Sequence, residues 1–185
     1  MILFILLACL IAKLNKHRVA PVLRDVSLYP FFAVECAYWV FQGFAFSGDY
    51  RFLPYSRILQ SAYIVSMLFP ILRHKLYARA ITGVMMVAAG TALNRLVMSA
   101  NGGRMPVYPT LSKLTGYFDP QALSGGHDAV HIPMGADTAL NFLGDIIDVG
   151  FSIMSPGDLL IQGFSAVIFY GVIKSLIRSQ KGGGG

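Results

Sequence analysis

The polar side chains that could do chemistry are few in this chain, and most of them lie in its second half. Asn141, Asp145 and Asp148 have the spacing i, i+4, i+7, which puts all three on one face if residues 138–154 form a helix. A face of this kind binds a cation or a polar substrate, or it is simply solvated. Both interpretations remain open.

Hydrogen-bond donors are supplied by Asn94, Arg95, Asn101 and Arg104. The Asn-Gly-Gly sequence that begins at Asn101 is a strong turn signal. A guanidinium group binds carboxylates and other anions through two parallel hydrogen bonds, so the two arginines either face an anionic ligand or pair with acids. We therefore expect Arg104 to contact an acidic side chain of residues 138–158.

The sequence Ser155-Pro156-Gly157-Asp158 has the pattern of a helix start. Serine caps the first turn, proline is favoured at the first helical position, and an acid at the third position approximates a capping box. Asp158 also begins a polar stripe that continues through Gln162 into an apolar run. That stripe makes Asp158 a candidate ligand-binding residue.

His127 and His131 are four residues apart, with Asp128 and Asp137 close by. Neutral imidazole and carboxylate groups together suit zinc, so a membrane-surface enzyme that holds a metal with His127, His131 and Asp145 is an alternative. The hydrolase motif H-E-x-x-H is not present, because aspartate follows His127. A metal ion is the only cofactor that the sequence suggests.

Glu35 lies inside an apolar run, with Tyr38 and Gln42 on the same helical face. An ionisable residue inside a membrane span is a candidate functional residue. The alternative is a structural ion pair between Glu35 and Arg79.

The elements that must position these residues are strongly apolar. The chain has 185 residues, of which 55% are hydrophobic and 13% charged, whereas soluble domains carry roughly 25% charged residues. The formal net charge of +6 does not indicate nucleic-acid binding, because the lysines and arginines gather at the ends of apolar runs, as in cytoplasmic loops. The sequence has no phosphate-binding loop and no serine nucleophile motif, and it favours a protein without enzymatic activity.

The apolar runs predict an all-α, polytopic membrane helix bundle with about five transmembrane helices. The runs are residues 1–14, 28–46, 55–72, 78–100 and 157–177. Basic clusters follow the first, third and fifth runs, which predicts a bacterial cytoplasmic membrane protein with the N-terminus outside and the C-terminus in the cytoplasm. Carboxylates at the bilayer centre are costly, so we expect residues 138–154 to form a non-spanning helix on the outer side.

We expect residues 1–180 to form a single transmembrane domain, with an outer loop and short helices over residues 101–154. An irregular segment of that length is unusual unless it is functional. Residues 181–185, a lysine and four glycines, have the composition of a linker or a tag remnant. Cys9 and Cys36 lie in apolar runs, where lone thiols behave as small hydrophobic side chains.

Several short motifs resemble those of a family of small bacterial multi-pass membrane proteins of unknown function. The motifs are Asn94, Asn101-Gly-Gly-Arg-Met-Pro-Val107, Thr138, Leu143-Gly-Asp145 and Ser155-x-Gly-Asp158. The resemblance implies a membrane location and a site on the outer face. It implies no substrate.

The sequence as a whole predicts an integral membrane protein that binds or translocates a small polar or charged ligand, or a lipid headgroup, at the extracytoplasmic end of the bundle. The expected ligand-binding residues are Asn94, Arg95, Asn101, Arg104, Asp145, Asp148, Asp158 and Glu35. The lipid bilayer is the expected partner, and a homo-oligomer or a membrane partner chain stays open. If the chain is a subunit of a larger complex, we expect Gly83 and Gly90 to face the partner helix.

Overall fold

The computed structural model describes residues 1–49, 51–52, 55–118 and 130–182. The chain forms two compact units. Unit 1 comprises residues 1–44, 51–85 and 162–185, and unit 2 comprises residues 45–50 and 86–161. The described chain is mostly helical, and its strands are short.

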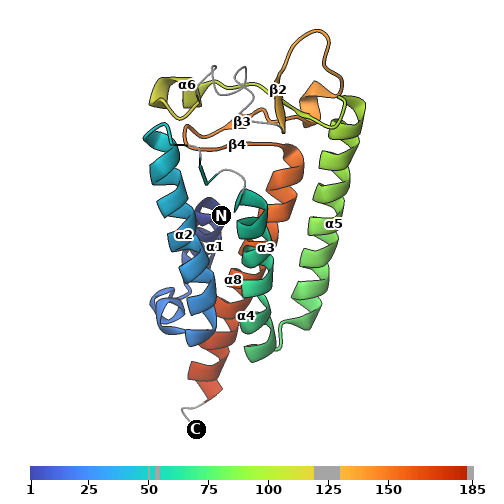
Figure 1. The fold of residues 1–185 in the computed structure, drawn as a ribbon. Coiled ribbons are helices and arrows are strands. Elements are labelled where there is room, and N and C mark those ends of the chain that lie inside the picture. The colour runs from blue at the N-terminus through green and yellow to red at the C-terminus, as the bar shows by residue number, and fades with distance from the viewer. Residues whose placement is uncertain (50, 53–54, 119–129, 183–185) are drawn as a thin grey trace. The chain divides into compact units, whose positions relative to one another are not determined.

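Unit 1 is built from helices. They are α1 (Ile2–Leu14), α2 (Tyr29–Phe46, with residues 29–44 in this unit), α3 (Ser56–Ser66), α4 (Leu68–Arg73), residues 77–85 of α5 (Tyr77–Ala100) and residues 162–182 of α8 (Pro156–Gly182). Two short 3-10 helices, η1 (Ala20–Arg24) and η2 (Val26–Leu28), connect α1 to α2. The C-terminal half of α8 lies alongside α1–α4 (Figure 1).

The core of unit 1 forms around α8. Phe31 of α2 and Phe169 of α8 are almost fully buried, and their rings meet edge to face with centroids 5.0 Å apart. Tyr63 of α3 packs against Phe31 with ring centroids 5.5 Å apart. Such aromatic pairs add about 0.5–1.5 kcal/mol to the stabilisation that burial provides. They join α2, α3 and α8 into one packed group.

The predicted apolar run 55–72 is not one continuous helix, because it is divided at Met67 into α3 and α4. Pro70 accounts for the division. A proline ring clashes with the carbonyl group four residues earlier and cannot donate to it, and that carbonyl belongs to Ser66, the last residue of α3. The Ser66 hydroxyl donates to the carbonyl oxygen of Tyr63 at 2.7 Å.

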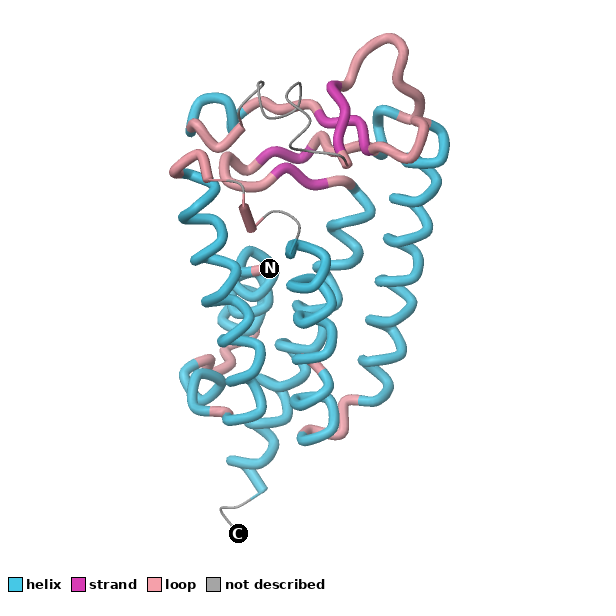
Figure 2. The backbone as a smooth tube through the Cα atoms, in the orientation of Figure 1, coloured by secondary structure: helices cyan, strands magenta, loops and turns pink. Residues whose placement is uncertain are grey.

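Unit 2 carries short strands and turns between residues 86–100 of α5 and the start of α8 (Figure 2). Its elements are β1 (Met105–Val107), α6 (Leu111–Thr115), β2 (His131–Pro133), η4 (Asn141–Leu143), β3 (Ile147–Asp148) and β4 (Ile153–Met154). β1 pairs with β2 in parallel, with Met105 opposite His131. β3 pairs with β4 in antiparallel, with Ile147 opposite Met154. The expected all-α class therefore needs a correction for these small sheets.

Residues 138–154 do not form the predicted helix. Gly150 has a φ of +86°, which L side chains rarely adopt, and a Cβ added at Gly144 would lie 2.7 Å from the carbonyl oxygen of Pro106. The backbone N–H of Asp145 donates to that same carbonyl at 2.8 Å. Asp145 thus pairs with Val107 at the end of β1, and β3 pairs with β4 within the same segment. The polar face expected from the i, i+4, i+7 spacing therefore does not exist.

The predicted start of the last helix is confirmed. α8 begins at Pro156. The Ser155 hydroxyl accepts from the backbone N–H of Asp158 at 2.9 Å, and the backbone N–H of Ser155 donates to the Asp158 carboxylate at 3.1 Å. These reciprocal bonds are a capping box. The ends of α1, α2 and α5 also agree with the ends of the predicted runs.

Gly83 and Gly90 face α8 of the same chain, so the expectation that they face a partner helix is wrong. In unit 1, a Cβ at Gly83 would lie 2.1 Å from the ring of Phe164. In unit 2, a Cβ at Gly90 would lie 2.3 Å from the carbonyl oxygen of Gly157. The missing side chains let the two helices approach closely, as small residues do between packed helices.

Two helices in the described chain, α5 and α8, are long and apolar enough to cross a membrane. α1 and the α3–α4 segment are apolar but shorter. A helix of 13 residues, the length of α1, spans about 20 Å, less than the roughly 30 Å of a bilayer core. Helix length and composition therefore give two candidate spans among the described residues, fewer than the five expected.

The close contact at Gly90 generates the first prediction. We expect Gly90→Ala to lower stability by about 1–3 kcal/mol, because the new methyl group meets backbone instead of a side chain that can rotate away. Gly43→Ala in α2 is the control, since nothing lies within 4 Å of its Cβ position. Thermal unfolding of the purified proteins measures both changes, and an unchanged melting temperature for Gly90→Ala would contradict the packing.

Candidate functional site

The carboxylate of Asp148 holds two loops of unit 2 together. One oxygen accepts from the backbone N–H of Thr110 at 2.6 Å, from the N–H of Ser112 at 2.9 Å and from the Ser112 hydroxyl at 2.7 Å. The other accepts from the N–H of Gly150 at 2.9 Å. Burial disfavours the charged form, but the hydrogen bonds from Ser112, Gly150 and Thr110 outweigh it, so the pKa of Asp148 lies below its usual value. Asp148 is therefore a structural clamp.

Asn94 and Asp158 form a closed network with the helix cap of α8. The amide of Asn94 donates to Asp158 Oδ1 at 2.9 Å, and its carbonyl oxygen accepts from the Ser155 hydroxyl at 2.8 Å. Together with the capping box, these bonds link residues 86–100 of α5 to the first turn of α8 in unit 2. The network satisfies its own members, which supports a structural role for Asn94 and Asp158.

Asn101 fixes the turn that follows α5. Its amide donates to the carbonyl oxygens of Val97 at 2.8 Å and Ala139 at 2.9 Å, and its own carbonyl accepts from the N–H of Ala139 at 2.8 Å. The predicted turn is confirmed, because Gly102 and Gly103 both have positive φ values. Asn101 is thus occupied by backbone groups.

Arg95 and Arg104 are both exposed. Within the described part of the chain, no ion pair joins Arg104 to Asp145, Asp148 or Asp158, so the predicted contact is wrong. The reason is that amide, hydroxyl and imidazole groups close to these acids in the fold already bind them. Both guanidinium groups remain accessible to solvent and to ligands.

Among the described residues of unit 2, His131 and Asp145 bring two ionisable side chains of the predicted site together. The imidazole Nε2 of His131 lies 3.2 Å from Asp145 Oδ2. The Asp145 side chain is 5% exposed and that of His131 is 35% exposed. Asp145 is held by pairing with β1, since its N–H donates to Pro106 and its carbonyl accepts from the N–H of Tyr108 at 2.9 Å. A buried carboxylate therefore orients an imidazole that reaches solvent.

The structure describes two of the three residues of the predicted metal site. His127 lies outside the described residues. Among the described residues, no cluster of three or more histidine, cysteine, aspartate or glutamate side chains is arranged to hold a metal ion. His131 and Asp145 are the described members of the proposed metal set.

Glu35 is held inside unit 1 by hydrogen bonds and not by Arg79. The hydroxyl of Tyr63 donates to Glu35 Oε2 at 2.5 Å, and the indole N–H of Trp39 donates to Oε1 at 3.2 Å. Arg79 lies instead over the ring of Tyr170, 5.6 Å from its centroid. The predicted neighbour Gln42 donates to the hydroxyl of Tyr38. Glu35 thus links α2 to α3.

A further polar cluster in unit 1 did not emerge from the sequence. Asp25 accepts from the N–H of Ser27 at 2.9 Å and from its hydroxyl at 2.6 Å, and it contacts His74 at 2.7 Å and Arg73 at 3.5 Å. Burial opposes ionisation, but the bonds from Ser27 and the contact with His74 prevail and lower the pKa of Asp25. The Asp-x-Ser sequence, typical of a capped turn, was the available signal.

The clamp at Asp148 generates a prediction about pH. Its folded pKa is depressed, so its contribution is fully present above the unfolded pKa, about 3.9, and is lost as the pH falls through the folded value. We expect Asp148→Asn to melt below the wild type at neutral pH, and the two melting curves to converge below about pH 4. Thermal unfolding between pH 3 and pH 7 tests this. The exposed Asp137→Asn is the control, and a gap that persists undiminished at pH 3 would contradict the clamp.

Comparisons with known proteins place the chain in a family. The model of a family of unknown function, DUF5317, matches residues 21–170, which is most of the chain and includes His131, Asp145 and Asp158. Neither a curated protein nor a solved structure matches it. The match agrees with the predicted resemblance to a family without assigned activity. This chain belongs to the family of unknown function DUF5317.

Proposed function

We propose that this chain is a multi-pass membrane protein that binds a small polar or charged ligand, such as a lipid headgroup, through the His131–Asp145 pair. The observation that carries the proposal is a buried carboxylate 3.2 Å from a partly exposed imidazole. Asp148 and Asp158 lie in the same unit, but they accept hydrogen bonds from backbone amides, hydroxyls and an amide side chain. Asp145 alone among these three acids faces a titratable group.

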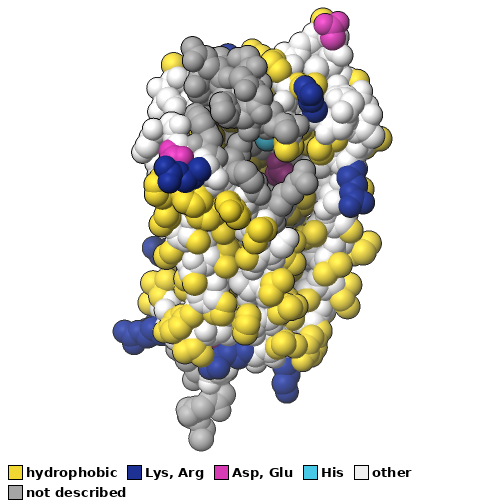
Figure 3. Space-filling view, viewed as in Figure 1, with side chains coloured by type: hydrophobic (Ala, Val, Ile, Leu, Met, Phe, Trp, Pro, Cys, Tyr) yellow, Lys and Arg dark blue, Asp and Glu magenta, His cyan; other side chains and the backbone are white. Residues whose placement is uncertain are grey.

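The exposure of apolar side chains supports the membrane location. The most apolar stretch of α5 has only 17% of its residues buried, whereas the core helix of a soluble protein is mostly buried. Exposed fractions reach 67% for Ile81 and 66% for Met85. Hydrophobic side chains cover the visible outer faces of the helices (Figure 3). A surface of this kind fits lipid and not water.

Contacts inside unit 1 support the proposed topology. Asp25 follows Arg24 of the first basic cluster and contacts His74, which lies between Arg73 and Lys75 of the second. His74 in turn contacts Ser175, which follows Lys174 of the third. All three clusters therefore gather at one end of unit 1, as cytoplasmic loops do. The chain between Arg79 and Lys174 must then cross the membrane an even number of times, which supports α5 and α8 as the two spans and residues 101–154 as outer.

The pair suits ligand binding for electrostatic reasons. Moving a carboxylate out of water is costly unless a partner compensates, and here the partner is a side chain that reaches solvent. The carboxylate fixes one ring nitrogen of His131, so the imidazole has a defined orientation. The same arrangement would serve a zinc ion, which makes metal binding the second candidate. The exposed Arg104 adjoins Met105, the residue paired with His131.

The topology generates a prediction. In a variant whose Cys9 and Cys36 are replaced by serine, we introduce Asp137→Cys in one protein and Ser179→Cys in another. We expect a membrane-impermeant maleimide to label position 137 in intact cells, and position 179 only after permeabilisation. Labelling of both positions from the same side would refute the topology.

The ligand site generates a second prediction. Phosphoethanolamine, glycerol 3-phosphate and Zn²⁺ are added separately to protein in nanodiscs of neutral lipid, and the melting temperature is measured, because a ligand stabilises the state that binds it. We expect one probe to raise the melting temperature of the wild type. Asp145→Asn and His131→Gln should weaken that probe by about tenfold or more, since hydrogen bonds to charged groups contribute about 1.5–3 kcal/mol.

Asp137→Asn serves as the matched control, because it removes an exposed carboxylate from the same unit. It should respond to the probe as the wild type does. Equal responses of Asp145→Asn and the wild type would refute the site. A lowered melting temperature of Asp145→Asn without any probe, combined with no response of the wild type, would assign the pair a structural role instead.

A further inference from the structure

A second polar site lies in unit 1, where the link between α4 and α5 meets the C-terminal part of α8. A cavity of about 240 Å³ opens there. It is lined by His74, Lys75, Leu76, Ala78, Arg79, Gly171, Lys174, Ser175 and Arg178. The motifs that resemble the family contain none of these residues, and the proposed ligand site of unit 2 does not include them.

The cavity has an uncompensated positive charge. Lys75, Arg79, Lys174 and Arg178 line it, and none of its described lining residues is acidic. The nearby carboxylate, Asp25, is already bound by Ser27, His74 and Arg73. Like charges brought together repel unless an anion or water intervenes. The positive-inside rule requires basic residues at this end but does not require them to converge.

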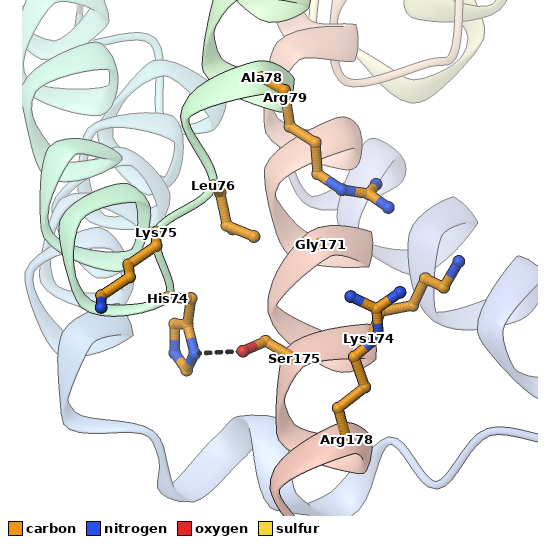
Figure 4. A pocket seen from close by; sticks show the side chains of 9 residues that line it. All are labelled: His74, Lys75, Leu76, Ala78, Arg79, Gly171, Lys174, Ser175 and Arg178. Atoms are coloured by element: carbon orange, nitrogen blue, oxygen red, sulfur yellow. Dashed lines mark hydrogen bonds between the residues drawn. The ribbon is translucent and has the colours of Figure 1, made fainter.

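Three of these side chains point to the same side of α8. In Figure 4, Arg79 extends from α5 across α8, and Lys174 and Arg178 extend from α8 on that side, whereas Lys75 points away. The arrangement offers two guanidinium groups and one ammonium group to a single anion. Guanidinium groups bind phosphate oxygens through two parallel hydrogen bonds, and an ammonium adds a compact charge.

The position of Arg79 depends on Gly171. A Cβ at Gly171 would lie 2.7 Å from Arg79 Cδ and 3.2 Å from Arg79 Nε. The glycine therefore lets the arginine side chain lie flat on α8, where its guanidinium rests over Tyr170. A cation above an aromatic ring is held in place even where it is partly exposed. Arg79 is thus positioned before any ligand arrives.

His74, another lining residue of the cavity, is fixed as well. His74 Nδ1 lies 3.1 Å from the Ser175 hydroxyl and Nε2 lies 2.7 Å from Asp25 (Figure 4 shows the first contact). The His74 side chain is only 8% exposed. Both ring nitrogens are in use, so His74 joins the α4–α5 link to α8 and leaves the three cations to meet the ligand.

We propose that this cavity binds a phosphate group through Arg79, Lys174 and Arg178. The phosphate has two possible sources with the same chemistry, namely a soluble phosphate compound and the headgroup of an anionic phospholipid. The site is separate from the His131–Asp145 pair and does not depend on it.

The experiment uses the full chain in nanodiscs of phosphatidylcholine, titrated with inorganic phosphate while the melting temperature is followed. A second arm measures, by native mass spectrometry, retention of phosphatidylglycerol from a mixture with phosphatidylcholine. We expect the wild type to respond in one arm at least. Arg79→Gln together with Arg178→Gln should weaken that response by tenfold or more, because two charged hydrogen-bond donors are lost.

Two further variants separate a built site from a general excess of charge. Lys75→Gln removes one charge from the same link, but the Lys75 side chain points away from the other three cations. This variant should therefore bind phosphate as the wild type does. Gly171→Ala keeps every charge, favours the helix and displaces Arg79, so it should bind phosphate several-fold more weakly while folding normally. The melting temperature without phosphate reports folding of each variant.

The two arms identify the source. A response to inorganic phosphate alone assigns a soluble phosphate compound, and retention of phosphatidylglycerol alone assigns a lipid headgroup. Both outcomes support the proposal. The proposal is overturned if the wild type responds in neither arm. It is also overturned if Lys75→Gln loses as much affinity for phosphate as the double variant, or if Gly171→Ala binds phosphate as tightly as the wild type.

Discussion

A carboxylate that leaves water keeps its charge only where hydrogen-bond donors replace the water molecules it loses. In this apolar chain the requirement decides how the irregular segments fold. Asp148 accepts hydrogen bonds from the backbone amides of residues 110, 112 and 150, and Asp158 accepts hydrogen bonds from Asn94 and Ser155. In unit 1, Asp25 binds Ser27 and His74. The bonds from Asp148 to residues 110 and 112, from Asp158 to Asn94 and from Asp25 to His74 join segments that are distant in the sequence. These acids therefore hold the irregular parts in place.

The donors that satisfy these acids are mostly short and neutral. A backbone amide or a serine hydroxyl gives up little hydration when it is buried, whereas a guanidinium loses a large hydration free energy. This difference explains why Arg95 and Arg104 remain exposed although acids are plentiful in their unit. Asp145 differs from Asp148 and Asp158, because its partner His131 is ionisable and reaches solvent.

Charge is divided between the two units. Most described acids belong to unit 2, whereas unit 1 contains Asp25 and Glu35. Basic residues predominate in unit 1, and three of them converge beside α8. The proposed ligand site at His131 and Asp145 lies in the unit that holds most of the described acids, and the proposed phosphate cavity lies in the unit that holds most of the basic residues.

The sequence by itself determined the positions of the long helices α1, α2, α5 and α8. Apolar runs predicted α1, α2, α5 and α8, and the Ser-Pro-Gly-Asp pattern predicted the start of α8, because these signals depend on neighbouring residues only. The turn at Asn101 was likewise local. Pro70 was also a local signal that the helix divides between α3 and α4, but the prediction followed the continuous apolar run instead.

The tertiary structure alone decided the fold of residues 138–154 and the partner of each acid. The i, i+4, i+7 spacing of Asn141, Asp145 and Asp148 favoured a helix, but Asp145 pairs with β1 and Asp148 accepts hydrogen bonds from the distant residues 110 and 112. The convergence of Arg79 with Lys174 and Arg178 was hidden for the same reason. Contacts between residues nearly a hundred positions apart depend on how helices pack, and the spacing of residues along one helix carries no information about its neighbour.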